Sequence, residues 1–144
     1  MLVVVDTSVL ISAVLWRGLP HRLIDLAESG NIRLCVTDET IQEFRDVLSR
    51  SKFTSRLQAR LTTVEEILQS TLRQAALYPT PSPVKVVEAD PDDDMFIACA
   101  LVSGAKYLVS ADSHLLALRE YAGVAVVTVR EFLEMEFPSV LREA

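Results

Sequence analysis

The chain has 144 residues, of which 50% are hydrophobic and 24% are charged, which predicts one globular domain over residues 1–144 and excludes disorder. Its longest uncharged stretches, 7–16 and 95–105, are shorter than the ~18 residues that a membrane helix needs, and MLVVVD at its start lacks the pattern of a secretory signal, so we expect a soluble, cytoplasmic protein. The net charge of -6 argues against a generally basic nucleic-acid-binding surface, but it permits a nucleic-acid enzyme whose acids are gathered at its site.

Short apolar strands alternate with helices along the chain. Strands are predicted at 2–5, 32–36, 84–87, 107–109 and 124–127. Helical spacing of apolar residues predicts helices over 9–14, over 23–27 before Gly30, and over 41–48 after a cap at Thr37 or Asp38. Further helices are predicted over about 53–77 (one or two helices), 91–103, 112–118 and 129–136. Almost wholly apolar strands that alternate with helices are typical of a parallel sheet covered on both faces. The predicted fold is therefore of the α/β class, a three-layer α/β/α sandwich with a central parallel sheet of about five strands. In such folds, ligands bind at the carboxyl ends of the strands.

Acidic residues follow three of the predicted strands. Asp6 comes directly after the first strand, Asp92 to Asp94 after the third and Asp112 after the fourth. Carboxylates that converge without cationic partners repel each other unless a divalent cation binds between them. Oxygen ligands of this kind favour magnesium or manganese. A fourth acid would come from the helix after the second strand, which offers Glu39, Glu43 and Asp46, and periodicity does not choose among these three.

Each acid also has a purely structural interpretation. Asp6 and Asp112 could each cap the helix that follows, and Asp92 and Asp93 complement the positive end of a helix dipole. Asp94 leads into a helix that is apolar on every side, so its carboxylate needs a partner in the core. The joint placement of acids after three strands favours a functional site over three separate caps.

Four segments carry a resemblance to a known family: VVVDTSVLISA at 3–13, TIQEF at 40–44, DPDDDMFIACALVSGAKYLVSAD at 90–112 and VTVREFL at 127–133. Together they cover nearly the whole chain and resemble the PIN domain, a metal-dependent ribonuclease fold. The resemblance is greatest to the VapC-like toxin components of bacterial toxin-antitoxin modules.

The resemblance implies hydrolysis of RNA phosphodiester bonds with one or two Mg²⁺ or Mn²⁺ ions. It places the family's acids, as metal ligands and catalytic groups, on Asp6, Glu43, Asp94 and Asp112, although Asp93 can compete with Asp94. Ser8 and Ser110 match hydroxyl positions that would orient the carboxylates or water. A cognate antitoxin and a homodimer are further implications.

Basic residues are sparse but clustered, mostly within one predicted helical stretch from Arg45 to Arg60. The candidates for RNA contact are Arg17, Arg45, Arg50, Lys52 and Arg56, with Arg60 on the same stretch. The cluster could follow an RNA backbone, form a solvated helix face, or meet an acidic partner segment. Trp16 is expected to be a partly buried core aromatic, with base stacking as the alternative.

Three other functions are compatible with an acid after the first strand. A phosphohydrolase of the haloacid dehalogenase type needs a second aspartate two residues after the first, where this chain has Ser8. A receiver domain needs a pair of adjacent acids at the end of the first strand and a lysine at the end of a later strand, whereas Lys106 stands at the start of its strand. Both functions are therefore disfavoured. A non-catalytic PIN-fold binding or scaffold module is the remaining alternative, and the presence of all four acids argues against it.

Overall fold

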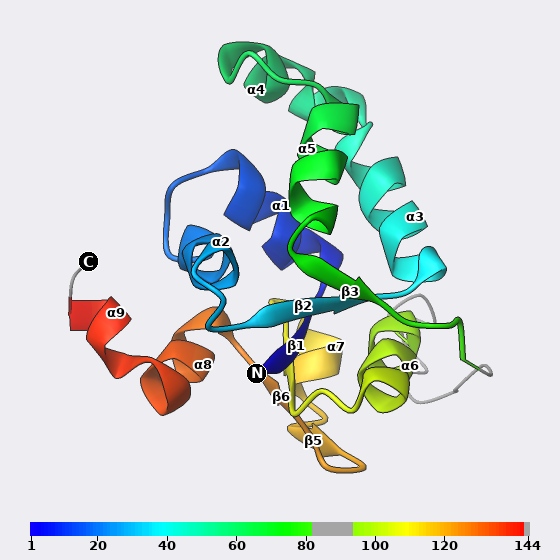
Figure 1. Ribbon diagram of the computed structural model, residues 1–144, viewed down its shortest axis with the longest axis vertical. Helices are drawn as coiled ribbons and strands as arrows, with labels where there is room; N and C mark the ends of the chain where they lie inside the picture. Colours follow the sequence, from blue (N-terminus) through cyan, green and yellow to red (C-terminus); the bar gives the residue numbers. More distant parts are fainter. Residues whose placement is uncertain (82–93, 143–144) are drawn as a thin grey trace.

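A computed structural model describes residues 1–81 and 94–142 of the chain, and in this part six strands form one mixed sheet (Figure 1). The strand order is β3-β2-β1-β4-β6-β5, with all neighbours parallel except the antiparallel pair of β5 and β6. The strands are β1 (Leu2–Val5), β2 (Arg33–Val36), β3 (Ala75–Leu77), β4 (Tyr107–Val109), β5 (Glu120–Tyr121) and β6 (Val124–Val127).

Helices connect these strands and cover both faces of the sheet. They are α1 (Thr7–Leu15), α2 (His21–Glu28), α3 (Asp38–Leu48), the 3-10 helix η1 (Ser51–Phe53), α4 (Thr54–Ala59), α5 (Val64–Leu72), α6 (Asp94–Ser103), α7 (Ser113–Leu116), α8 (Val129–Glu136) and α9 (Pro138–Arg142). In the described ranges, none of these helices is long and apolar enough to cross a membrane.

The sheet separates two hydrophobic cores, because successive side chains of a strand point to opposite faces. In β1, Val3 and Val5 pack with residues of α1, α2, α3 and α8, whereas Val4 packs with residues of α6 and α7. Figure 1 shows α1, α2, α3 and α5 on one side of the sheet and α6 and α7 on the other. The α/β class and the three-layer sandwich predicted from the sequence are thereby confirmed.

Helix α6 is buried around most of its circumference, as its uniformly apolar sequence predicted. Ile97, Cys99 and Ala100 are fully buried, and the Cys99 thiol donates to the main-chain carbonyl of Cys35 in β2 at 3.4 Å. Because α6 packs against both the sheet and α3, its first residue, Asp94, is placed in a buried position.

Most predicted elements are present with bounds shifted by one or two residues. The strands at 2–5, 107–109 and 124–127 are confirmed, and β2 begins at Arg33 rather than at Ile32. The predicted strand at 84–87 and the first residues of the helix predicted at 91–103 lie outside the described residues.

The prediction of helix up to residue 77 was wrong at its end. Helix α5 stops at Leu72, and Ala75–Leu77 pairs with β2 in parallel, with Ala76 opposite Cys35. Alanine and leucine favour helices as isolated residues, but the exposed backbone of β2 offers a row of hydrogen-bonding groups that outweighs this preference.

The antiparallel edge strand β5 was also not predicted. It forms a two-residue hairpin with β6 through Ala122 and Gly123, which both have positive φ values, 49° and 87°. This is the backbone geometry of a type I′ turn, in which glycine is favoured. A further unpredicted helix, α9, begins at Pro138, in the first helical position that tolerates the missing N–H of proline.

Candidate functional site

A cavity of about 360 Å³ opens beyond the carboxyl ends of β1 and β4, where ligands bind in parallel sheets of this kind. Three of the predicted acids, Asp6, Glu43 and Asp112, line it. We call these three residues the acidic part of the cavity. They come from three separate segments of the chain, so the fold brings together residues that are distant in the sequence.

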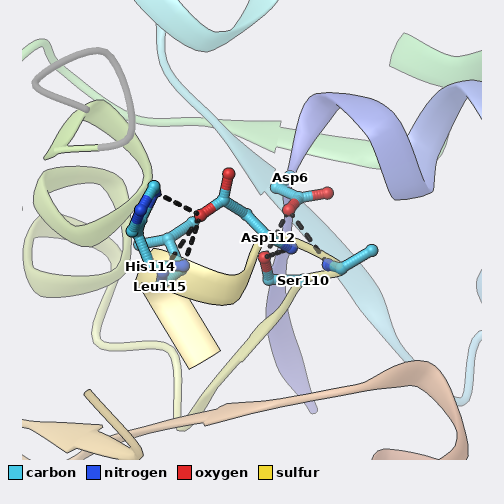
Figure 2. Close-up of polar contacts among 6 residues, drawn as sticks. Asp6, Ser110, Asp112, His114 and Leu115 are labelled. Carbon is cyan, nitrogen blue, oxygen red and sulfur yellow. Dashed lines mark hydrogen bonds and ion pairs between the residues drawn. The ribbon is translucent and has the colours of Figure 1, made fainter. Parts of the chain in front are cut away.

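The sheet itself aligns the ends of β1 and β4. Val5 lies opposite Val109 in the parallel register, and the main-chain N–H of Asp6 donates to the carbonyl of Val109 at 3.0 Å. Ser110, the residue that follows β4, therefore lies beside Asp6. Its hydroxyl donates to Oδ2 of Asp6 and accepts from the main-chain N–H of Asp112 at 2.9 Å (Figure 2). Ser110 thus links the carboxylate of Asp6 to the main chain of Asp112.

Asp6 is a buried carboxylate, with only 4% of the residue exposed. Its Oδ1 accepts from the main-chain N–H of Val9 at 3.0 Å and from the hydroxyl of Ser8 at 3.3 Å, and its Oδ2 also accepts from the N–H of Ala111 at 3.3 Å. Burial raises the pKa of Asp6 above its ordinary value, although the hydrogen bonds from Ser110, Val9, Ala111 and Ser8 oppose the shift. The described residues supply hydrogen bonds to this carboxylate but no ion pair.

The cap interpretation of Asp6 is correct, but it does not compete with the site interpretation. Asp6 is the N-cap of α1 through its bond from Val9. A cap needs one carboxylate oxygen, and here the second oxygen is held by residues that follow β4 instead. The same side chain therefore caps a helix and joins two strand ends.

Asp112 combines a cap with an exposed oxygen in a similar way. Its Oδ1 accepts from the main-chain N–H groups of His114 and Leu115 at 2.8 and 3.2 Å and lies 3.8 Å from Nδ1 of His114. In Figure 2 all dashed lines to the Asp112 carboxylate end on this one oxygen, while the other points away from α7. Asp112 itself lines the cavity.

Among the three acids of α3, the structure brings one to the cavity. Glu43 lines it together with Asp6, whereas Asp46 accepts a hydrogen bond from Gln42 on the exposed face at 2.8 Å and Glu39 is exposed near the start of the helix. Phe44 and Leu48 are buried against the core, which turns the neighbouring Glu43 toward α1. The periodicity of α3 could not select Glu43 from the three acids, because it does not tell where α1 lies relative to α3.

The third predicted aspartate position is only partly described. Asp94 begins α6 and is 8% exposed, but it does not line the cavity, whereas Phe96 of the same helix does. Asp93, its competitor, lies outside the described residues. The assignment of a ligand to Asp94 or Asp93 therefore stays a prediction.

The five basic candidates are placed differently from one another. Arg50 and Lys52 line the cavity, while Arg45 forms an ion pair with Glu65 and does not line it. The Nε of Arg56 donates to the carbonyl of Leu15 at 2.8 Å, so this guanidinium helps to cap the end of α1. Arg17 is exposed in the segment after α1.

Within the described part of the chain, three aromatic residues also line the cavity. Trp16 is 42% exposed, so the prediction of a partly buried core residue was wrong. Phe53 and Phe96 line the cavity as well, together with Thr7, whose buried Oγ1 has no hydrogen-bond partner in the described chain. Phe53 and Phe96 carry no spacing signal, so the sequence gave no reason to place these two rings here, whereas for Trp16 base stacking was the alternative to a core position.

The donors of the acidic part are chemically suited to a hard divalent cation, because all are carboxylate oxygens. Burial raises the pKa of Asp6, so the surrounding chain does not fully stabilise its charged form, and the unpartnered hydroxyl of Thr7 adds an unsatisfied oxygen in the described part of the cavity. Within residues 1–81 and 94–142, however, no three acidic, histidine or cysteine side chains are close enough together to hold a metal ion. The donor chemistry therefore fits such an ion, whereas its coordination geometry is not defined.

The fold and this cavity define a three-layer α/β/α domain with carboxylates at the carboxyl ends of adjacent parallel strands. The model of the PIN domain family matches residues 2–114, and the chain belongs to the PIN domain family. No curated protein is a significant match to the chain.

Two solved structures share this fold. The first is a chain of VapBC2 from Rickettsia felis, in a complex bound to a DNA fragment from the promoter. It has a TM-score of 0.58 and 12% sequence identity, and the match covers 88% of this chain and 97% of that one. The second is a chain of FitAcB from Neisseria gonorrhoeae, with a TM-score of 0.52 and 22% identity over 89% of this chain and 98% of that one. At these identities the likeness concerns the fold alone.

Proposed function

We propose that the protein is a divalent-metal-dependent endoribonuclease that hydrolyses RNA phosphodiester bonds. The observation that carries this proposal is the buried Asp6 carboxylate in a cavity that Glu43 and Asp112 also line, with Arg50 and Lys52 on its wall. Acids that can hold a cation and cations that can hold a phosphate are both needed for this reaction. Membership in a family whose members are generally nucleases supports the same conclusion.

The residues proposed to hold one or two Mg²⁺ or Mn²⁺ ions are Asp6, Glu43, Asp112 and Asp94, with Asp93 as the alternative to Asp94. When bound, such an ion lowers the pKa of water at the site and stabilises negative charge on the attacked phosphate and the leaving oxygen.

The chain's own hydrogen bonds prepare Asp6 for this role. Donors from Ser110 and Ala111 hold Oδ2, and donors from Val9 and Ser8 hold Oδ1, so the carboxylate cannot rotate freely. A fixed carboxylate loses little conformational freedom when a ligand binds, and groups that orient a metal ligand in this way commonly affect activity.

We further propose that the protein is the toxin component of a toxin-antitoxin module, with a cognate antitoxin and a homodimeric state. The sequence motifs of the VapC-like group support this assignment, as does the similarity in fold to chains of VapBC2 and FitAcB. Production of the protein in a bacterial host with and without its neighbouring reading frame tests this role. Growth arrest that the neighbouring frame relieves is expected, and unimpaired growth with active protein would contradict it.

The nuclease proposal is tested with purified protein and total cellular RNA, in manganese, in magnesium and in chelator, with new RNA ends mapped by sequencing. We expect metal-dependent ends that disappear with Asp6→Asn and Asp94→Asn, while circular dichroism shows an intact fold. A matched single-stranded DNA pool measures the preference for RNA. No new ends with any metal would favour a non-catalytic PIN-fold binding module.

Two glutamates of α3 provide a matched pair for the same assay. Glu43 lines the cavity and Glu39 is exposed. Glu43→Gln is expected to reduce the cleavage rate by at least the ~10- to 100-fold that is typical when groups supporting a metal ligand are removed. Glu39→Gln should retain the rate of the wild type, and equal losses in both variants would contradict the placement of Glu43.

A further inference from the structure

Trp16 is an exposed aromatic ring on the wall of the proposed nuclease cavity. It follows the last residue of α1, is 42% exposed and lines the same cavity as Asp6, the residue before α1. Helix α1 has nine residues and is therefore about 14 Å long. The ring and the acidic part are thus separated by roughly the length of this helix along one continuous cavity.

Neighbouring side chains hold the indole ring in place. The guanidinium of Arg56 lies over the ring, 5.2 Å from its centroid, and Phe53 contacts it edge-on with a centroid distance of 6.4 Å. Arg56 is itself fixed, because its Nε donates to the carbonyl of Leu15, and Arg60 donates to the same carbonyl at 2.9 Å. The indole is consequently supported by ordered groups and still has exposed surface for a ligand.

Positive charge lies next to this aromatic surface. Arg50 and Lys52 are exposed and line the cavity, and the ammonium of Lys52 lies 5.1 Å from the centroid of Phe53. Exposed aromatic rings combined with cations that contact a backbone are the means by which proteins bind single-stranded nucleic acid. A nucleic-acid duplex cannot use such a ring, because the faces of its bases are already stacked on each other.

We propose that Trp16 stacks on an unpaired base of the substrate strand, while Arg50 and Lys52 contact its phosphates. The strand is then unpaired where it passes Trp16, and it is cleaved at a phosphate near the acidic part. This inference rests on the proposed nuclease function, whose site it extends. Stacking also accounts for a tryptophan that is 42% exposed on the wall of this cavity.

The protein has a single tryptophan, which makes the proposed contact directly observable. Intrinsic fluorescence is measured in chelator, so that no cleavage occurs, during titration with a ten-nucleotide single-stranded RNA of mixed sequence or with a long double-stranded RNA, in which few base pairs are terminal and expose a face. We expect saturable quenching by the single strand and little change with the duplex at the same phosphate concentration. Equal quenching by both forms, or none by the single strand at saturation, would overturn the proposal.

Substitutions at Trp16 provide a second measurement, the anisotropy of the labelled single strand. Trp16→Ala is expected to weaken binding by about 5- to 100-fold, the range for loss of one stacked base. Trp16→Phe should recover most of the affinity because it retains a ring. Met135→Ala removes an exposed apolar side chain on α8 that does not line the cavity and should leave the affinity unchanged. Thermal unfolding of each variant separates a loss of fold from a loss of contact.

The two proposals fail in different ways. Metal-dependent cleavage with unchanged RNA affinity in Trp16→Ala would overturn the stacking site and leave the nuclease intact. Quenching by single-stranded RNA without cleavage in any metal would overturn the nuclease and leave a binding site. If Trp16→Ala weakens self-association in analytical ultracentrifugation but not RNA binding, the ring is a protein contact and the stacking proposal is wrong.

Discussion

The pairing of sheet strands positions the acidic part of the cavity, whereas contacts between side chains position Trp16 and Phe53. We call these two residues the aromatic part of the cavity. The parallel register of β1 and β4 brings Asp6 beside Ser110, and four hydrogen bonds then fix the carboxylate. Trp16 instead depends on Arg56, which reaches back from α4 to the end of α1. The first arrangement is tied to the core of the fold, and the second can change without altering the sheet.

This difference indicates a division of roles between the two parts. Groups that hold a cation must be placed accurately, because the chemistry depends on small displacements. Groups that hold a strand at a distance contribute affinity, which tolerates more variation in geometry. We therefore expect substitutions in the acidic part to reduce the rate of cleavage and substitutions in the aromatic part to reduce affinity.

Removal of the Ser110 hydroxyl should have the largest effect among substitutions that leave all carboxylates in place. Ser110→Ala takes a donor from the buried Oδ2 of Asp6, so we expect a ~10- to 100-fold lower cleavage rate and a loss of about 1 to 3 kcal/mol in the free energy of unfolding. Steady-state kinetics and chemical denaturation measure these two quantities.

Ser8→Ala is the matched control for this substitution. Ser8 donates to the other oxygen of the same carboxylate, but it is exposed, so water can replace it and the change in stability should be within about 0.5 kcal/mol. If both serine variants had the same effect, the sheet-positioned link between Asp6 and Ser110 would not be the feature that matters.

Charge removal beside the aromatic part should have a smaller effect, on affinity and on its dependence on salt. Arg50→Gln and Lys52→Gln should each lower the slope of log K against log salt by about 0.7, which corresponds to about fivefold weaker binding of single-stranded RNA at 0.1 M salt. Arg45→Gln tests a cation that pairs with Glu65 away from the cavity and should leave the slope unchanged. An equal effect of Arg45→Gln would indicate a diffuse basic surface instead of a defined path.

The same contrast explains what could be predicted from the sequence. The placement of Asp6 and Asp112 follows from strand ends, and apolar strands that alternate with helices are visible in the sequence. The choice of Glu43 over Glu39 and Asp46 depends on how α3 packs against its neighbours, which the residues of α3 do not encode alone. The surroundings of Trp16 could not be predicted, because Arg56, which lies over its ring, is forty residues later in the chain.

Fold details that depend on long-range pairing were lost for the same reason. The residues of β3 have no strand preference of their own and become a strand only because β2 has an open edge. The hairpin of β5 and β6 depends on a local feature, the positive φ values at Ala122 and Gly123. In the sequence this turn is marked by only one glycine, which is a weak indication of a hairpin.

The pH dependence of stability should show the smallest difference, and it isolates the buried charge of the acidic part. Burial raises the pKa of Asp6, so in chelator the folded protein binds this proton more tightly than the unfolded chain does. Stability from this group is therefore present below the unfolded value of about 3.8 and is lost as pH rises through the higher folded value. Asp6→Asn has no titrating group at this position, so its stability does not contain this pH-dependent contribution.

The measurement compares the free energies of unfolding of wild type and Asp6→Asn from pH 3.5 to 7.5. As pH rises, the free energy of unfolding of the wild type should fall relative to that of Asp6→Asn and then become constant. A difference between the two proteins that is the same at every pH reports the altered hydrogen bonds at Ala111 and Ser110. Manganese should reduce the shift in the wild type, because a cation that binds the carboxylate favours its charged form. A difference that does not vary with pH would mean that Asp6 carries no uncompensated charge, and the acidic part would then lack the property that suits it to a metal ion.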